Sequence, residues 1–266
     1  MQFQLNQPWL VAAWPGMGGV AKIAGRYLAE QLEAEVVAEI APDDYFDLQG
    51  VQVHAGLVQG ADLPHSRLLA WRNPGEGPDL LILDADMQPS QRGLGFCEDL
   101  LTLAQGQGIT RVLTFAAMAT QSLPTAASKV LAAATHDDFL GSIQAAGIGI
   151  LGEGQILGLN GVLLAAASMR GIPAACLLGE FPYYASSIPN PKASAAILRA
   201  FGRLTGITLD LAPLDQQAAE IEAQLAPQIE RLQHLQRSLP APDPEKEPEE
   251  SWSRGSSLFE EQDTDP

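Results

Sequence analysis

Cysteine and positive charge are both scarce in this sequence. Its 266 residues include two cysteines, and 15 lysines and arginines stand against 32 aspartates and glutamates, giving a formal net charge of −17. Cys97 and Cys176 lie far apart in apolar surroundings, so we expect reduced core thiols rather than a disulfide framework or a metal site. The negative charge repels phosphate backbones and anionic lipid, so we expect no nucleic-acid partner and no membrane partner.

Long apolar runs are missing as well. The longest ones, such as residues 161–169, are far shorter than the roughly 20 residues that a helix needs to cross a bilayer. No charged leader precedes the apolar run at residues 9–14, which is too short for a signal-peptide core, so we expect a cytoplasmic protein. What is present is 46% hydrophobic residues, enough for a substantial buried core.

Short apolar runs alternate with longer periodic ones over residues 1–239, which we interpret as one domain. Strand patterns occupy residues 9–14, 35–40, 68–72, 79–83, 111–115, 147–151 and 174–178. Helical patterns occupy residues 20–32, 94–105, 161–170, 191–205 and 214–235. Strands that alternate with helices predict an α/β fold with a mainly parallel sheet covered on both faces.

The composition changes at residue 240. Residues 240–266 are rich in Pro, Glu, Asp and Ser and contain nine acids against two bases. Such a segment cannot bury enough apolar surface to offset the entropy of ordering, so we predict a disordered acidic tail.

A glycine-rich turn follows the first predicted strand and opens the first helix. The N–H groups of a helix start can receive an anion, so the ligand-binding candidates here are Gly16, Met17, Gly18 and Gly19. The spacing Gly16-x-Gly18-x-x-Ala21 also fits the dinucleotide-binding fingerprint, with Glu39 where a ribose-binding acid would stand. A tight turn with no ligand is the alternative interpretation.

Further candidates follow other predicted strands. Asp86 follows residues 79–83, Glu153 and Asn160 belong to a second glycine loop before residues 161–170, and Glu180 and Tyr183 follow residues 174–178. Because the carboxyl ends of parallel strands meet at one edge, we expect these residues and the glycine turn to converge on one crevice. The alternatives are a turn-capping role for Asp86, close packing at the second loop, and an interface at Glu180 and Tyr183.

Signatures of familiar chemistry are absent. The sequence contains no Gly-x-Ser-x-Gly elbow, no His-Glu-x-x-His helix and no phosphate-binding Gly-Lys-Ser/Thr loop. The cluster His136-Asp137-Asp138 has no distant His or Cys pair to complete a metal site, so we interpret it as a helix start. We therefore predict neither a metal nor a cofactor.

Five segments, taken in order, resemble the proteasome assembly chaperone 2 family, in its uncharacterised prokaryotic branch. They are WPGMGGV at 14–20, MQP at 87–89, ILGLNG at 156–161, EFPYY at 180–184 and PNPKASA at 189–195. The resemblance covers residues 9 to about 235. It implies a three-layer α/β/α sandwich similar to the phosphorylase and nucleoside hydrolase-like folds, self-association, and, for eukaryotic relatives, escorting of proteasome α subunits.

The resemblance favours an assembly-chaperone-like or ligand-binding protein without a defined catalytic activity. Its expected partners are further copies of itself, a protein partner, and a small anion or nucleoside-like ligand. The alternative is a small-molecule enzyme, of nicotinamide or phosphorylase/hydrolase type, that binds a nucleotide or nucleoside at Gly16 to Gly19.

Two further expectations concern assembly. The predicted helices carry more apolar surface than one sheet obviously buries, as at Ile197, Leu198 and Phe201. This excess favours a homo-oligomer. Relatives that dock on proteasomes tend to end in a hydrophobic residue, a tyrosine and one more residue, whereas this chain ends Asp263-Thr264-Asp265-Pro266. We therefore expect no proteasome docking through the tail.

Overall fold

The computed structural model describes residues 5–47, 50–60, 63–122 and 126–238. The chain divides into two units, Met1–Glu222 and Ala223–Pro266. In the second unit, the described residues form the end of helix α6 (Ala212–Ser238), which contains Pro227. The predicted tail, residues 240–266, lies outside the described residues.

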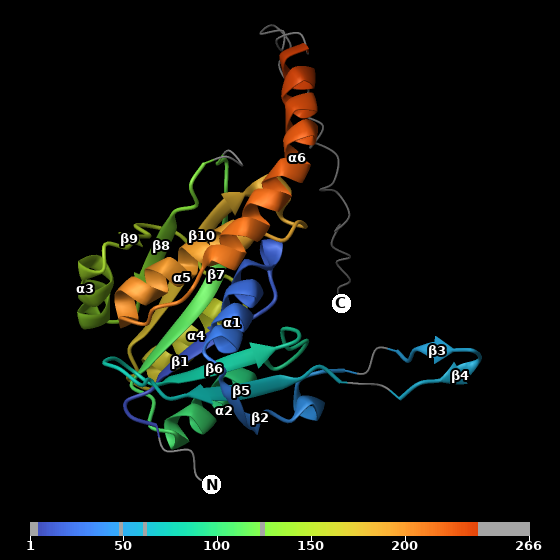
Figure 1. Ribbon diagram of the computed structural model, residues 1–266. Coiled ribbons are helices and arrows are strands. Elements are labelled where there is room, and N and C mark those ends of the chain that lie inside the picture. The colour runs from blue at the N-terminus through green and yellow to red at the C-terminus, as the bar shows by residue number, and fades with distance from the viewer. Residues whose placement is uncertain (1–4, 48–49, 61–62, 123–125, 239–266) are drawn as a thin grey trace, which may run out of the picture. The chain divides into compact units, whose positions relative to one another are not determined.

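An eight-stranded sheet occupies the middle of the first unit, with strands in the order β2-β5-β6-β1-β7-β10-β8-β9 (Figure 1). The strands are β1 (Trp9–Ala13), β2 (Glu35–Glu39), β5 (Ser66–Trp71), β6 (Leu80–Ala85), β7 (Arg111–Thr120), β8 (Val130–Ala134), β9 (Gly149–Ile150) and β10 (Ala174–Pro182). β6, β1, β7 and β10 are mutually parallel, whereas β5, β8 and β9 run in the opposite direction. The expected mainly parallel sheet is confirmed.

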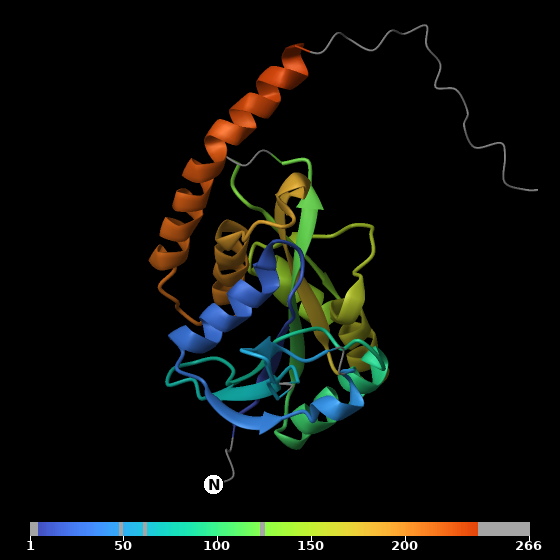
Figure 2. The same cartoon turned by 90° about the vertical axis from the view of Figure 1, so that its right-hand side faces the viewer.

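Helices cover both faces of this sheet (Figure 2). One face carries α1 (Val20–Gln31), α3 (Asp137–Ala145) and α5 (Pro191–Thr205), and the other carries α2 (Gly93–Gly106) and α4 (Gly158–Met169). Side chains alternate between the two cores along β1, because successive residues of a strand point to opposite faces. Val11 belongs to the core that contains Phe201, and Leu10 belongs to the core that contains Phe96. The three-layer arrangement is confirmed.

Helix α5 has the bounds that the sequence predicts, because its signals are local. The Asn190 side chain accepts a hydrogen bond from the Ala193 N–H at 2.9 Å, and Pro191 occupies the first turn. Gly206 ends the helix in the left-handed conformation (φ 78°), which glycine adopts without a steric penalty.

Three features of the fold depart from the prediction. A hairpin of β3 (Val53–His54) and β4 (Leu57–Val58) extends away from the sheet in Figure 1, and its strands pair with each other. Strand β8 and helix α3 also went unpredicted as elements, although α3 begins at Asp137, where we expected a helix start. Ile197, Leu198 and Phe201 are all buried in the core, so their use as evidence for an oligomer was wrong.

Within the described ranges, no helix combines the length and the apolarity needed to cross a membrane.

The two cysteines are free and buried, as the sequence predicts. Burial raises the pKa of both the Cys97 and Cys176 thiols to about 12, so the thiolate fraction is about a thousandfold below that of a thiol with the ordinary value of 9.0. We expect native protein at pH 8 to release almost no chromophore from Ellman's reagent within minutes. Two equivalents should appear on adding guanidinium chloride, and a rapid native reaction would contradict the burial.

Candidate functional site

Four parallel strands end at one edge of the sheet, here called the carboxyl edge. β1, β6 and β10 end there at Ala13, Ala85 and Pro182, and β7 lies between β1 and β10. The glycine turn and the segment after β10 therefore meet at the same edge, as predicted. This is where open α/β sheets place their ligand crevice.

The glycine turn is tied to the segment after β10. Gly18 and Gly19 adopt the left-handed conformation (φ 59° and 60°), which only glycine enters readily. The Gly18 N–H donates to the Ser186 carbonyl at 2.7 Å, and the Asn190 N–H donates to the Gly18 carbonyl at 2.8 Å. The two segments thereby satisfy each other's backbone groups.

The backbone N–H groups that we expected to bind an anion at this turn already form hydrogen bonds within the protein. The Gly19 N–H donates to the Gly16 carbonyl at 3.0 Å, and the Val20 N–H donates to Met17. With the Gly18 amide, three amides at this helix start already have protein acceptors. A turn that would cradle an anion needs these donors directed outward, so the geometry favours a structural role for the turn.

The acidic residue that would complete the dinucleotide fingerprint, Glu39, is not in position to bind a ribose. A ribose-binding acid works from the strand next to the glycine turn, but β5 and β6 separate β2 from β1. Three strand spacings amount to about 14 Å, which is beyond the reach of the Glu39 side chain. Glu39 instead contacts His65, with 2.6 Å between Oε1 and Nδ1. The spacing match in the sequence was therefore misleading.

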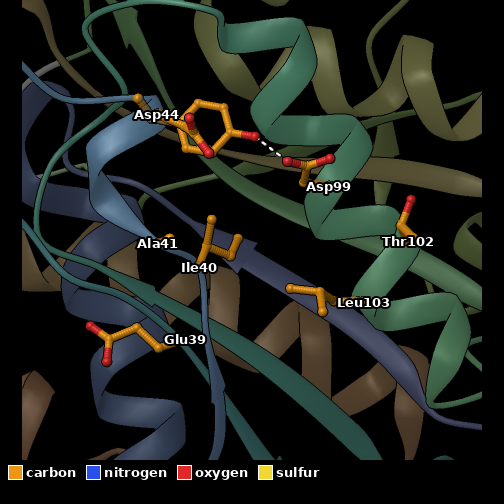
Figure 3. A pocket seen from close by; sticks show the side chains of 8 residues that line it. Glu39, Ile40, Ala41, Asp44, Asp99, Thr102 and Leu103 are labelled. Atoms are coloured by element: carbon orange, nitrogen blue, oxygen red, sulfur yellow. Dashed lines mark hydrogen bonds between the residues drawn. The ribbon is translucent and has the colours of Figure 1, made fainter.

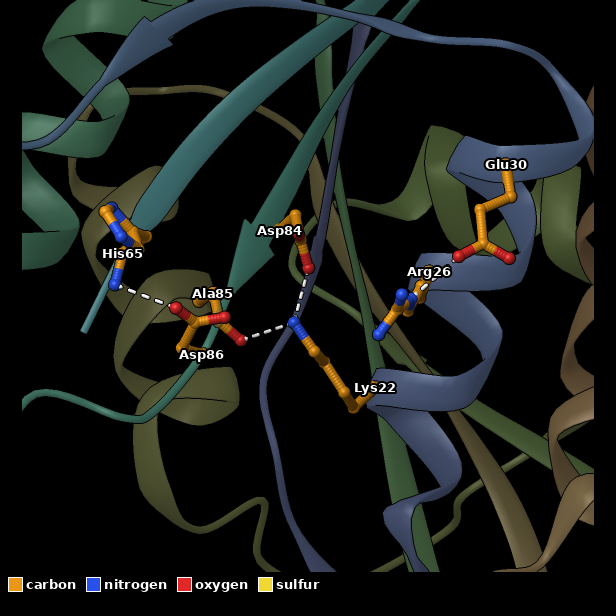
Figure 4. A network of polar contacts seen from close by, with 7 residues as sticks. All are labelled: Lys22, Arg26, Glu30, His65, Asp84, Ala85 and Asp86. Atoms are coloured by element: carbon orange, nitrogen blue, oxygen red, sulfur yellow. Dashed lines mark hydrogen bonds and ion pairs between the residues drawn. The ribbon is translucent and has the colours of Figure 1, made fainter. Parts of the chain in front are cut away.

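Lys22 organises the polar groups beside the turn (Figure 4). Its ammonium forms an ion pair with Asp84 and donates to the Ala85 carbonyl at 2.8 Å. Asp86 accepts the His65 N–H at 3.0 Å, so its carboxylate joins the end of β6 to the start of β5 and does not cap the turn that follows β6. Sequence reasoning missed Lys22, although it is the first basic residue and lies in the first turn after the glycines.

Glu153 and Asn160 do not occupy the positions that the sequence predicts. β9 runs antiparallel to β10, so the exposed Glu153 follows a strand that points away from the carboxyl edge. The chain then returns to that edge, because α4 begins beside Gln88, whose side chain donates to the Pro15 carbonyl at 2.9 Å. Asn160 lies within the first turn of α4 rather than in a loop before it, and its Oδ1 is buried without a partner in the described part of the chain.

Glu180 and Tyr183 belong to the end of β10. This strand extends four residues beyond the predicted end at Leu178, so Glu180 lies inside it, opposite Met118 of β7. The expectation that Glu180 follows the strand was wrong. Tyr183 begins the short helix η3 (Tyr183–Ala185), and its ring meets that of Tyr184 edge to face at 5.6 Å. Both tyrosines are exposed.

Several exposed apolar side chains lie at the carboxyl edge, and we call this group the apolar rim. Met17 follows β1, Met87 follows β6, and Leu157 precedes α4. The rim comprises Met17, Met87, Leu94, Leu157, Tyr183 and Tyr184, each 48–78% exposed. Groups of exposed apolar side chains mark interaction sites. Sequence reasoning missed the rim, because its members come from five separate segments.

A small cavity of about 250 Å³ lies between the end of β2 and α2 (Figure 3). Its lining residues are Glu39, Ile40, Ala41, Asp44, Tyr45, Asp99, Thr102 and Leu103. The Tyr45 hydroxyl donates to Asp99, and burial raises the pKa of Tyr45 to about 12. The phenol therefore stays protonated near neutral pH and holds α2 against the segment after β2. In the described ranges, no three His, Cys, Asp or Glu side chains are grouped as metal ligands.

These features define a class: a three-layer α/β protein whose carboxyl edge carries a tied glycine turn and an apolar rim. The chain belongs to the PAC2 family, whose model matches residues 10–229. The expected family membership is thus confirmed.

Three relatives illustrate the similarity. Pyrococcus furiosus PbaB, an archaeal proteasome activator, is 25% identical with a TM-score of 0.73, over 85% of this chain and 95% of that chain. A Mycobacterium tuberculosis proteasome-assembly chaperone homologue is 27% identical with a TM-score of 0.71, over 82% and 94%. An uncharacterised protein of Methanocaldococcus jannaschii is 26% identical over 82% of this chain and 81% of its own length.

Proposed function

We propose that this protein is a non-catalytic, assembly-chaperone-like protein whose copies associate through the apolar rim and bind a protein partner as an oligomer. The observation that carries the proposal is the rim itself. The edge where an α/β enzyme would hold its substrate presents Met, Leu and Tyr side chains to solvent.

Charge and packing support a protein-binding role for this edge. Two copies with a net charge of −17 repel each other, so association needs a surface with little charge of its own. The rim supplies such a surface, and methionine and tyrosine are among the residues enriched at protein interfaces. The similarity to a proteasome activator and to a proteasome-assembly chaperone homologue supports the chaperone-like role.

Charged residues in the rim are expected to abolish self-association. In the double variant Met87→Glu/Leu157→Glu, two apolar side chains are lost and two carboxylates would be buried, so association should weaken at least about 100-fold. Analytical ultracentrifugation over a range of concentrations measures this change. Wild type should sediment as an oligomer at micromolar concentration and the variant as a monomer.

The matched control is Met169→Glu. Met169 is 79% exposed and ends α4 at the opposite edge of the sheet, so the same substitution there should leave the oligomer intact. A monomeric wild type, or an oligomer that survives both rim substitutions with unchanged affinity, would refute the proposal.

A further inference from the structure

A groove of about 600 Å³ runs along α5, and its lining includes no residue of the rim. Its walls are α5 on one side and the segments around β8 and β9 on the other, consistent with the position of α5 beside β8 and β10 in Figure 1. Val130, Leu131 and Ala196 contribute apolar surface to it. The groove therefore combines an open volume with an apolar lining.

Positive charge is concentrated in this groove. Its lining includes four of the chain's 15 bases and one acid, in a protein whose net charge is −17. The basic residues are Lys129, Lys192, Arg199 and Arg203. Three of them lie on one stripe of α5, because positions 192, 196, 199 and 203 follow helical spacing.

The groove already binds carboxylates from its own chain. Arg199 forms an ion pair with Asp215, and Lys192 pairs with Glu222 at 2.6 Å. Arg203 donates one of the five N–H groups of its guanidinium to the Ala146 carbonyl at 3.0 Å. The exposed Lys129 ammonium has no partner in the described ranges. Lys129 and Arg203 therefore retain capacity for further anions.

We infer that this groove binds an acidic, extended peptide segment of a protein partner. The stripe from Lys192 to Arg203 spans roughly 16 Å along the helix, the length of about five extended residues. Alternation along such a segment presents carboxylates on one side and apolar side chains on the other, matching the bases and the apolar lining. With two of its four bases already neutralised, the groove suits a few carboxylates better than a polyphosphate. This inference uses no residue of the rim and does not rest on it.

The test uses the full-length protein and a fluorescein-labelled synthetic peptide of about ten residues that alternates Glu and Val. Fluorescence anisotropy should show binding that weakens as NaCl is raised. The same peptide with Gln in place of Glu should bind at least about tenfold more weakly. Equal binding of the two peptides would overturn the inference.

Variants locate the binding. Lys129→Glu should weaken binding of the Glu peptide about tenfold, because an attraction becomes a repulsion. The double variant Lys129→Glu/Arg203→Glu should weaken that binding about 100-fold. Arg26→Glu on α1 changes net charge equally outside the groove and should alter affinity less than about twofold. An equal effect of Arg26→Glu, or none of Lys129→Glu, would contradict the assignment. Circular dichroism confirms that each variant is folded.

Two further outcomes distinguish other occupants. If inorganic phosphate displaces the peptide at matched charge concentration, the site takes small anions and the peptide assignment fails. If Lys129→Glu dissociates the oligomer in the ultracentrifuge, the groove is a contact between copies and the assignment also fails. The rim variant Met87→Glu/Leu157→Glu should still bind the peptide with unchanged affinity, which separates this result from the proposal for the rim.

Discussion

Gly161→Ala is expected to lower the free energy of unfolding by about 3 kcal/mol, the upper part of the range for overpacking. Gly161 lies inside α4, and a Cβ added there would stand 2.0 Å from the carbonyl oxygen of Ile156. That atom belongs to the backbone, so relief requires the start of α4 to shift. Urea denaturation followed by circular dichroism measures the loss as a lower midpoint at unchanged slope.

Gly141→Ala is the matched control. Gly141 also lies inside a helix, α3, but nothing lies within 4 Å of a Cβ added there. Alanine should therefore raise the free energy of unfolding by about 0.5–1 kcal/mol through its better helix propensity. If both substitutions stabilise the protein, the Ile156 carbonyl oxygen does not lie as close to Gly161 as the structure places it.

Phe201→Ala is expected to cost about 3–5 kcal/mol, because it removes a fully buried ring and leaves a cavity. Phe201 lies on α5 and meets Phe115 of β7 edge to face, with 5.9 Å between ring centroids. The cavity would open between α5 and the middle of the sheet. The melting temperature and the urea midpoint should both fall.

Phe201→Leu at the same position separates cavity size from loss of apolar character. Leucine keeps most of the volume, so we expect a cost below about 1.5 kcal/mol. A cost for leucine that equals the cost for alanine would mean that the ring contact, and not the filled volume, stabilises this region.

Local signals account for what the sequence predicted well. The bounds of α5 follow from Asn190, Pro191 and Gly206, whose effects depend on neighbours in the chain. Strands β1 and β6 begin as runs of large apolar residues and were located by that alone, whereas β7 continues to Thr120, five residues beyond its predicted end. β8 was missed because its sequence, VLAAA, is mostly alanine, which has little preference for strands.

Long-range pairing accounts for what the sequence did not predict. The acceptor for the Gly18 amide is Ser186, a residue far along the chain, so no local pattern indicates that the turn is already satisfied. β10 continues to Pro182 because β7 pairs with it over nine residues, despite the glycine at 179. The direction of β9, which sends Glu153 away from the carboxyl edge, likewise depends on its neighbour β8.

The placement of β1 also constrains how the protein is made. β1 is made before the other strands of the sheet, yet the helix that follows it packs against α5, where the Ser194 hydroxyl donates to the Val20 carbonyl at 2.9 Å. α1 therefore exposes its apolar face until α5 has been synthesised and has left the ribosome. The nascent chain therefore displays apolar surface throughout the interval between α1 and α5, and slower elongation would lengthen its need for a holdase chaperone.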